Sequence, residues 1–184
     1  EYADSPQTVV RVSTDSSDQE ANGSSIGGVF SADGTQVLFD SNASNLVADD
    51  TNDVYDVFVK DIKTGEMTRI STDATGKQAN GDSFGVVFSA DGTKVLFESA
   101  ASNLVANDTN GKIDVFLKDL KTGEITLVSA NGSAEGFNGN SYAVALSADG
   151  TKILFNSDAN NAVISDTNSV TDAFIKDLTT GEIT

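Results

Sequence analysis

The stretch SADGTKVLFES occupies residues 89–99, and closely similar stretches stand at residues 31–41 (SADGTQVLFDS) and 147–157 (SADGTKILFNS). Each copy begins 58 residues after the previous one. An Asp-Gly turn opens every copy, and the apolar run behind it alternates as a pleated strand requires. The sequence therefore predicts one β-rich unit built three times.

The 58-residue spacing extends beyond this stretch to the rest of each unit. In the first unit we expect four strands, at residues 26–31, 36–41, 54–62 and 67–71. Residues 63–66 (KTGE) predict a tight hairpin turn in which Gly65 supplies a positive φ. Four antiparallel strands in a unit of this length are typical of a propeller blade, which buries its faces only against other blades.

The predicted fold is therefore an all-β propeller with three four-stranded blades of 58 residues. Residues 1–184 would form a single propeller half-domain, and its blades would span about 24–71, 82–129 and 140–184. Phenylalanine recurs at matching strand positions, which predicts that these rings pack between blades. The predicted core rings are Phe39, Phe58, Phe97, Phe116, Phe155 and Phe174.

The segment 89–99, followed by DVFLKDLKTGEITLVS at residues 114–129, resembles the PD40, or TolB-like, β-propeller repeat. The resemblance covers about three full repeats, with Ala32, Ala90 and Ala148 where the family usually has proline. The additional NLVA and DTN segments resemble those of a bacterial subset of large secreted or surface proteins. The resemblance thus implies a propeller fold and an extracytoplasmic location, but propellers carry many functions.

The two ends of the chain bear on how the ring closes. Residues 9–13 (VVRVS) align with a fourth strand but have no blade of their own, and the last blade reaches only part of its fourth strand at Thr184. Because propellers have about 4–8 blades, three do not close a ring. We favour a homodimer with a six-bladed ring, in which residues 9–13 complete a blade of the partner. A longer array or an open three-blade arrangement are the alternatives.

The composition excludes several classes of function. With 28 acidic and 11 basic residues the net charge is −17, which disfavours binding to nucleic acid or anionic lipid. The chain has no cysteine and no histidine, so disulfides, Cys/His zinc sites and Ser-His-Asp triads are excluded. No apolar run approaches the ~18 residues of a membrane span, so we expect no membrane insertion.

An acidic loop, DDTNDVYD at residues 49–56, recurs in each unit with the pattern Asp-x-Asn-x-x-x-Asp. Side chains at positions 1, 3 and 7 and a backbone carbonyl at position 5 are oxygen ligands suited to Ca²⁺. The predicted ligands are Asp50, Asn52, Val54 and Asp56; Asp108, Asn110, Lys112 and Asp114; and Asp166, Asn168, Val170 and Asp172.

The alternative is that Asp and Asn cap turns in these loops without a metal. Repulsion among several carboxylates in a chain of charge −17 favours a cation. The loops are not equivalent, because Asp49 is replaced by Asn107 and then by Ser165, so the third loop is expected to bind most weakly.

The loops that connect one unit to the next differ among copies, whereas the surrounding sequence repeats. In a propeller these loops ring one mouth of the channel, where an unidentified protein or small molecule would bind. The candidate contacts are Glu20, Lys77, Gln78, Glu135 and Phe137. Ordinary drift of surface loops explains the same differences. Lys60, Lys118 and Lys176 are expected at a solvated strand edge.

These observations favour a non-enzymatic, calcium-stabilised propeller module for scaffolding or recognition, in a secreted or cell-surface bacterial protein. One alternative is a glycosidase-like hydrolase with channel carboxylates as its acid and base. Only Glu20, Asp82 and Glu135 break the repeat symmetry as a catalytic site would. A second alternative is an artificial or consensus-like repeat protein.

Overall fold

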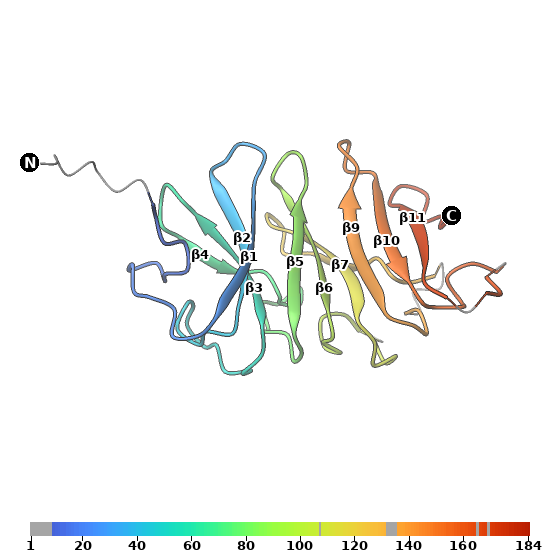
Figure 1. Cartoon of the computed structure of the whole chain (residues 1–184), viewed down its shortest axis with the longest axis horizontal. Helices are drawn as coiled ribbons and strands as arrows, with labels where there is room; N and C mark the ends of the chain where they lie inside the picture. The colour runs from blue at the N-terminus through green and yellow to red at the C-terminus, as the bar shows by residue number, and fades with distance from the viewer. Residues whose placement is uncertain (1–8, 107, 132–135, 165, 169) are drawn as a thin grey trace, which may run out of the picture.

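The computed structural model of the chain describes residues 9–106, 108–131, 136–164, 166–168 and 170–184. Every named element within these residues is a strand, and the strands form sheets that stand side by side in a row (Figure 1). The all-β propeller architecture predicted from the repeat is confirmed. No helix among the described residues is long and apolar enough to cross a membrane.

Each repeat forms one antiparallel sheet. The first contains β1 (Ser25–Phe30), β2 (Gln36–Ser41), β3 (Asp56–Asp61) and β4 (Met67–Arg69). The second contains β5 (Ser83–Phe88), β6 (Lys94–Ser99), β7 (Asp114–Asp119) and β8 (Ile125–Leu127). The third contains β9 (Ser141–Leu146), β10 (Lys152–Ser157) and β11 (Asp172–Asp177), and Ile183 adds an isolated bridge to Lys176. We call these sheets blades 1, 2 and 3.

The Asp-Gly hairpin turns use the aspartate as a brace. In blade 1, Asp33 Oδ1 accepts hydrogen bonds from Ser31 Oγ at 2.7 Å and from the Thr35 amide at 3.0 Å. Gly34 follows with φ of 71°, a conformation that glycine adopts without strain. The same contacts recur at Asp91 and Asp149. The prediction that these aspartates are turn residues is therefore confirmed.

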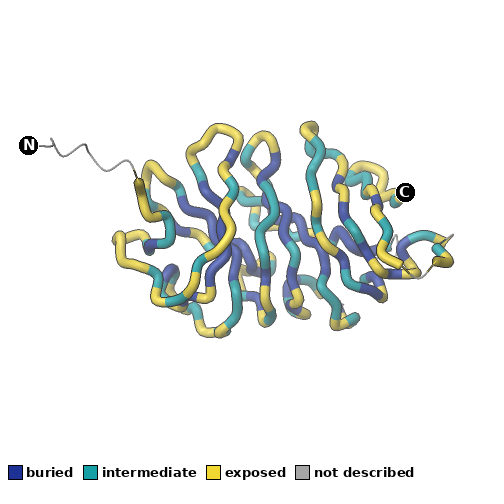
Figure 2. Tube along the Cα trace, viewed as in Figure 1, coloured by how far each residue is buried: buried dark blue, intermediate teal, exposed yellow. Residues whose placement is uncertain are grey.

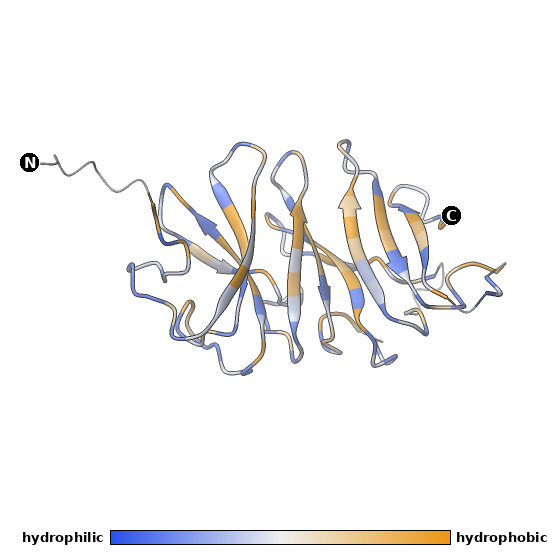
Figure 3. Cartoon of the chain, viewed as in Figure 1, coloured by the Kyte–Doolittle hydropathy of each residue, from blue (hydrophilic) through white to orange (hydrophobic). Residues whose placement is uncertain are grey.

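The blades pack face to face through their apolar residues (Figures 2 and 3). Leu38 and Val57 of blade 1 share a buried cluster with Phe97 and Phe116 of blade 2. Within each blade two phenylalanine rings stack, as in the Phe97–Phe116 pair with centroids 5.5 Å apart. Burial of the six predicted rings confirms that they are core. Each blade therefore depends on its neighbour to cover its apolar face.

The three repeated lysines correct a prediction from the sequence. Lys118 of blade 2 is buried, and its Nζ donates to the carbonyl oxygens of Thr72 and Asp73, both at 2.9 Å. Lys60 makes the matching contacts with Thr14 and Asp15, and Lys176 Nζ reaches the Ala130 carbonyl at 2.8 Å. The expectation of a solvated strand edge is wrong, because each amine ties its blade to the loop that precedes it.

Both ends of the row expose residues that the inner repeats bury. Phe30 of β1 is 65% exposed, whereas Phe88 at the matching position of β5 is 5% exposed. At the other end Leu154 of β10 is 36% exposed, whereas its counterpart Leu96 is fully buried. The difference follows from the row itself, because no further blade covers the outer faces of blades 1 and 3 (Figure 1). The described structure is therefore a partial propeller.

Residues 9–13 form no strand within this chain, and Val9 and Val10 are exposed. The backbone contacts printed for this segment are local, from the Ala21 amide to the Ser13 carbonyl at 3.0 Å and from the Thr14 amide to the Val12 carbonyl at 2.8 Å. At the other terminus Thr184 exchanges two backbone hydrogen bonds with Ile175 of β11, at 2.8 and 3.0 Å. Closure of a blade by residues 9–13 remains a prediction.

Candidate functional site

The first acidic loop connects β2 to β3 and places Asp56 at the fully buried start of β3. The Ser71 hydroxyl donates to Asp56 Oδ1, and Asn52 Nδ2 donates to Asp56 Oδ2 at 2.8 Å. Asn52 Nδ2 also donates to the Ala79 carbonyl at 3.0 Å, which links the loop to the next inter-unit loop. Asp56 is thus a hydrogen-bonded anchor for the entire loop.

An arginine supplies the positive charge of this loop. Arg69 of β4 places its Nη1 3.2 Å from Asp50 Oδ1 and 3.6 Å from Asp56 Oδ2. The same Nη1 donates to Gln78 Oε1 at 2.9 Å. Burial and repulsion from Asp56 raise the pKa of Asp50, and Arg69 opposes that rise. The guanidinium thus pairs with Asp50 and Asp56, two of the side chains predicted to bind a metal ion.

The second acidic loop keeps the carboxylates but has no arginine. Asp114 Oδ1 accepts from Ser129 Oγ at 2.6 Å and its Oδ2 from Asn110 Nδ2 at 2.8 Å. Leu127 stands at the position that matches Arg69. Burial, followed by repulsion from Asp114, raises the pKa of Asp108 to about 6. The two carboxylates of this loop therefore repel each other, and among the described residues neither forms an ion pair with a lysine or arginine.

The third acidic loop is more open. Asn168 Nδ2 donates to Asp172 Oδ2 at 2.9 Å, as in the other loops. Asp172 and Asp166 are only partly buried and Val170 is exposed. Ser165, which replaces Asp49, lies outside the described residues, as does Asn107. The local turn is therefore retained, although the surroundings that bury its counterparts are not.

At the position predicted to supply a backbone carbonyl, the backbone amide of the same residue donates a hydrogen bond within the loop. The amides of Val54, Lys112 and Val170 donate to the side-chain oxygens of Asn52, Asn110 and Asn168 at 3.5, 2.8 and 3.0 Å. These contacts are turns closed by asparagine, of the kind that forms without a metal. Among the described residues, no group of three or more acidic, histidine or cysteine side chains is placed to share an ion.

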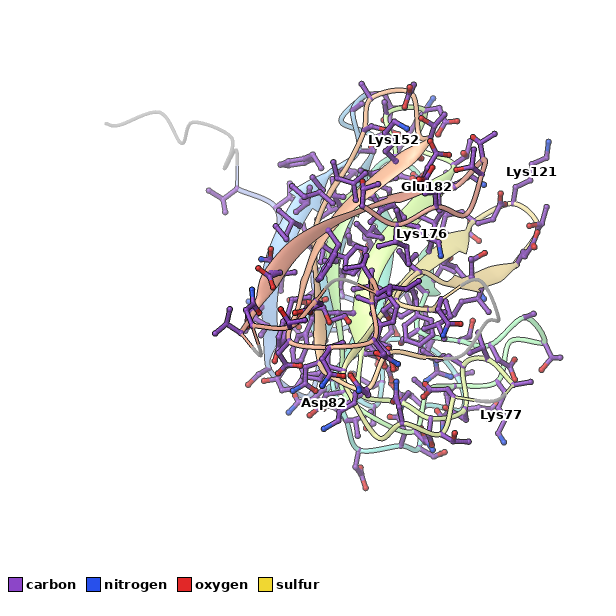
Figure 4. All side chains as sticks on the ribbon, turned by 90° about the vertical axis from the view of Figure 1, so that its right-hand side faces the viewer. Lys77, Asp82, Lys121, Lys152, Lys176 and Glu182 are labelled. Carbon is purple, nitrogen blue, oxygen red and sulfur yellow. The ribbon has the colours of Figure 1, made fainter. Side chains whose placement is uncertain are left out.

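The described residues among the predicted loop contacts differ in exposure. Glu20 is exposed and pairs with Arg11, and Lys77 points outward at the edge of the molecule (Figure 4). Gln78 is turned inward, where its Nε2 donates to Thr51 Oγ1 at 2.8 Å. Phe137 is fully buried and stacks on Phe155, so its ring belongs to the core between blades 2 and 3. Glu135 lies outside the described residues.

Other carboxylates tie neighbouring blades together. Asp40 of β2 accepts a hydrogen bond from the Gly85 amide of β5 at 2.8 Å, and Glu98 of β6 accepts one from the Ala143 amide at 3.2 Å. Asp82 accepts from the Tyr55 amide at 2.9 Å. Asn140, the counterpart of Asp82 in the next repeat, accepts from the Ile113 amide at 3.0 Å. Asp82 therefore has a structural role that an uncharged residue fills elsewhere in the chain.

We expect the buried carboxyl of Asp40 to make the stability of the protein depend on pH. Burial, with a smaller contribution from Glu98, raises the pKa of Asp40 to about 6. Because the folded pKa lies above the unfolded value of about 3.9, the native state binds the proton more tightly. The resulting stability is complete below the unfolded pKa and is lost as pH rises through about 6.

Asn156 occupies the matching position of the third repeat, so Asp40→Asn is a substitution that the fold already contains. At pH 8 we expect this variant to exceed the parent in free energy of unfolding by about 1–2 kcal/mol, with the difference vanishing near pH 4. Urea unfolding of both proteins between pH 4 and pH 8 measures this difference in the free energy of unfolding. Parallel pH profiles for the two proteins would show that Asp40 has an ordinary pKa.

A groove with a volume of ≈ 440 Å³ lies between blades 1 and 2 on the side of β4 and β7. Its walls include the acidic residues Asp61, Glu66 and Asp119. The cationic residues Lys118 and Arg69 also line the groove, but the Lys118 amine donates to the preceding loop and Arg69 is paired with Asp50 and Asp56. This surface is therefore suited to a basic or neutral group more than to an anion.

Two features of these sites were not predicted. These are the ion pairs of Arg69 with the first loop and the buried amines of Lys60 and Lys118. The signal for Arg69 was available, since the 58-residue repeat places an arginine there and Leu127 in the next unit. Its contacts with Asp50 and Asp56 nevertheless join strands that only the fold brings together.

No protein-family model matches the chain, and no curated protein matches it either. Solved structures do. TolB from Acinetobacter baumannii is 22% identical with a TM-score of 0.52, over 90% of this chain and 32% of its own. The putative TolB from Agrobacterium tumefaciens is 16% identical with a TM-score of 0.52, over 86% of this chain and 48% of its own.

The β-propeller domain of the Trilobed protease from Pyrococcus furiosus is 16% identical, with a TM-score of 0.54. The match covers 89% of this chain and 42% of the protease domain chain. The chain thus spans between about a third and half of the length of these three structures. At such identities the likeness establishes the propeller fold, in agreement with the repeat pattern, and the neighbours include both TolB and propellers of proteases.

Proposed function

We propose that the chain is a non-catalytic scaffold and recognition module, a half-propeller whose open faces join further blades. The observation that carries this proposal is the contrast between repeats. Ile175 of blade 3 is 42% exposed, whereas Leu117 at the same position of blade 2 is 7% exposed because blade 3 covers it. The face of blade 2 that contains Leu117 is covered by blade 3. The equivalent face of blade 3, which contains Ile175, is therefore suited to contact a further blade.

A second copy of the chain provides that blade. The open face of blade 3 presents Leu154 and Ile175, and the open end of blade 1 presents Phe30. These surfaces correspond to the two sides of an internal blade contact, so two copies related by a two-fold axis bury both pairs of ends in one six-bladed ring. Six blades lie within the range of about 4–8 that closes a propeller.

The mass of the protein in solution tests the ring. One chain has a mass of 19.1 kDa, and we expect light scattering to give twice this value at micromolar concentration. Leu154→Glu with Ile175→Glu is expected to return the protein to a single chain, because each charge is forced into an apolar contact. Ile164→Glu is the control, since Ile164 is also apolar, is more exposed than Leu154 and Ile175, and lies in the loop before β11. A single-chain mass for the parent at all concentrations contradicts the ring.

The roles of the repeated carboxylates support a non-catalytic function over a glycosidase-like one. Asp40 and Glu98 bind backbone amides of the adjacent blade. Asp82 is matched by a neutral asparagine, and Glu20 pairs with Arg11 at the surface. A glycosidase needs one free acid and one free carboxylate across a cleft. Because these carboxylates are already engaged in hydrogen bonds or ion pairs, we favour a recognition role of the loops over catalysis.

We place the module in an extracytoplasmic bacterial protein, with calcium as its expected ion. The resemblance of the repeat to the PD40 type and the lack of cysteine are compatible with that location. With a charge of −17, the partner at the loops is expected to be basic or neutral, and neither nucleic acid nor an anionic membrane. Lys77 and Glu20 are the exposed contacts proposed for it.

A further inference from the structure

The second acidic loop lacks two side chains of the first: the arginine that carries the positive charge and the glutamine that binds this arginine. Counting by the 58-residue repeat, Leu127 replaces Arg69 and Gly136 replaces Gln78. The carboxylates are kept, as Asp108 and Asp114 in place of Asp50 and Asp56. Of the three acidic pairs in the chain, the first therefore has an internal cation, whereas the second keeps its carboxylates without that arginine.

The first loop shows where a cation belongs in this arrangement. Nη1 of Arg69 lies 3.2 Å from Asp50 Oδ1, 3.6 Å from Asp56 Oδ2 and 2.9 Å from Gln78 Oε1. Oxygens from a β2–β3 loop, a β3 strand and an inter-unit loop thus converge on one positive atom. The equivalent point in the second loop lies between the carboxylates of Asp108 and Asp114.

The second loop leaves a buried oxygen without a partner. Asp108 is 5% exposed, and its Oδ2 receives no hydrogen bond in the described structure. Asp114 is fully buried, and its oxygens are held by Ser129 and Asn110. Within the described residues no lysine or arginine forms an ion pair with either carboxylate. Burying uncompensated charge is costly, so this loop lacks a component that the first loop has.

We propose that the second loop binds a hard divalent cation, with calcium expected, between Asp108 and Asp114, at the place that the Arg69 guanidinium occupies in the first loop. Asp108 Oδ2 and the carboxylate of Asp114 are its ligands, and water completes the shell of oxygens that Ca²⁺ or Mg²⁺ requires. Asn110 donates to Asp114 and so positions this ligand without binding the ion itself. The site concerns a single blade and does not depend on closure of the ring.

The decisive variant is Leu127→Arg, which gives the second loop the counter-ion of the first. Melting temperatures are measured in EDTA, CaCl₂ and MgCl₂, with NaCl added to equal ionic strength. For the parent, we expect one of the divalent cations to raise the melting temperature by about 5–10 °C at ~100 times its Kd. Leu127→Arg should melt at a higher temperature than the parent in EDTA and should no longer respond to either cation.

Two further variants keep the test independent of how Leu127→Arg folds. Asp108→Asn removes one ligand and its buried charge, so it should be stabilised in EDTA and lose the response to divalent cations. Arg69→Leu makes the first loop resemble the second, and calorimetric titration should then count a second bound ion. Asp166→Asn in the more open third loop is the matched control and should retain the response.

Two results overturn the proposal. The first is an unchanged melting temperature of the parent in EDTA, CaCl₂ and MgCl₂. The second is a response that persists in both Asp108→Asn and Leu127→Arg, because it would then come from general screening of the charge of −17.

Discussion

Phe88→Ala is expected to lower the free energy of unfolding by about 3–5 kcal/mol, the cost of removing a fully packed aromatic ring from a core. Phe88 lies at the end of β5 and belongs to the cluster between blades 1 and 2 with Leu38, Val95 and Phe97. Its loss leaves a cavity that the paired strands of two blades cannot close by moving together. Urea unfolding of the purified variant measures the effect.

Phe30→Ala is the matched control, because it makes the same change at the same repeat position on the open end of the row. With Phe30 65% exposed, its removal should alter the stability of a single chain by no more than about 0.5 kcal/mol. The comparison is made at protein concentrations low enough to keep single chains. Equal losses for the two variants would mean that the blade contact does not bury residue 88 more than residue 30.

Lys118→Met is expected to destabilise the chain by about 2–4 kcal/mol, although the substitution keeps the length of the side chain and adds no polar group. The lost amine leaves the carbonyl oxygens of Thr72 and Asp73 without their buried donor. Hydrogen bonds to charged groups are among the stronger ones, and buried unpaired acceptors add to the cost. The measurement is again equilibrium unfolding, together with hydrogen exchange of the loop at residues 72–76.

Lys94→Met provides the comparison on the same sheet. Lys94 of β6 forms a partly exposed ion pair with Asp119 at 2.8 Å, and such pairs contribute about 0–1 kcal/mol. If Lys118→Met costs no more than Lys94→Met, the buried amine does not hold the two blades together and its contacts are incidental.

Much of the fold could be predicted because its signals are local. Two features depend only on neighbours within a few residues and recur in every repeat. They are the alternating strand at Val37, Leu38 and Phe39 and the turn braced by Asp33. Stacking of the units followed from their apolar faces. The strand boundaries shifted by a few residues, as with β4, which ends at Arg69 where the pattern predicted residue 71.

The lysines were misplaced because charge was given more weight than alternation. In the strand DVFVKD, residues two apart share a face, so Lys60 lies on the side of Phe58 and Asp56. All three are buried. Lys60 donates to backbone carbonyl oxygens that lie 45 and 46 residues earlier in the chain. No local sequence pattern indicates that these carbonyl groups need a hydrogen-bond donor.

In the acidic loops, too, the local turn could be predicted from the sequence, whereas the contacts with distant residues could not. The pattern Asp-x-Asn-x-x-x-Asp correctly marked a conserved geometry within the chain, in which each asparagine braces the following aspartate. It could not distinguish a turn from a metal site, because that depends on what lies across the strand at residue 69 or 127. The exchange of Arg69 for Leu127 in the neighbouring strand removes the cation that pairs with the loop carboxylates.

The lysine contacts have a consequence for how such a chain grows. Each amine reaches back 45 or 46 residues, always into the loop of the unit before it, and never forward. Duplication of a 58-residue gene segment at any point therefore reproduces every tether intact, in the correct direction, without compensating mutations. A change in the number of units therefore leaves the contact between each unit and its preceding loop unaltered.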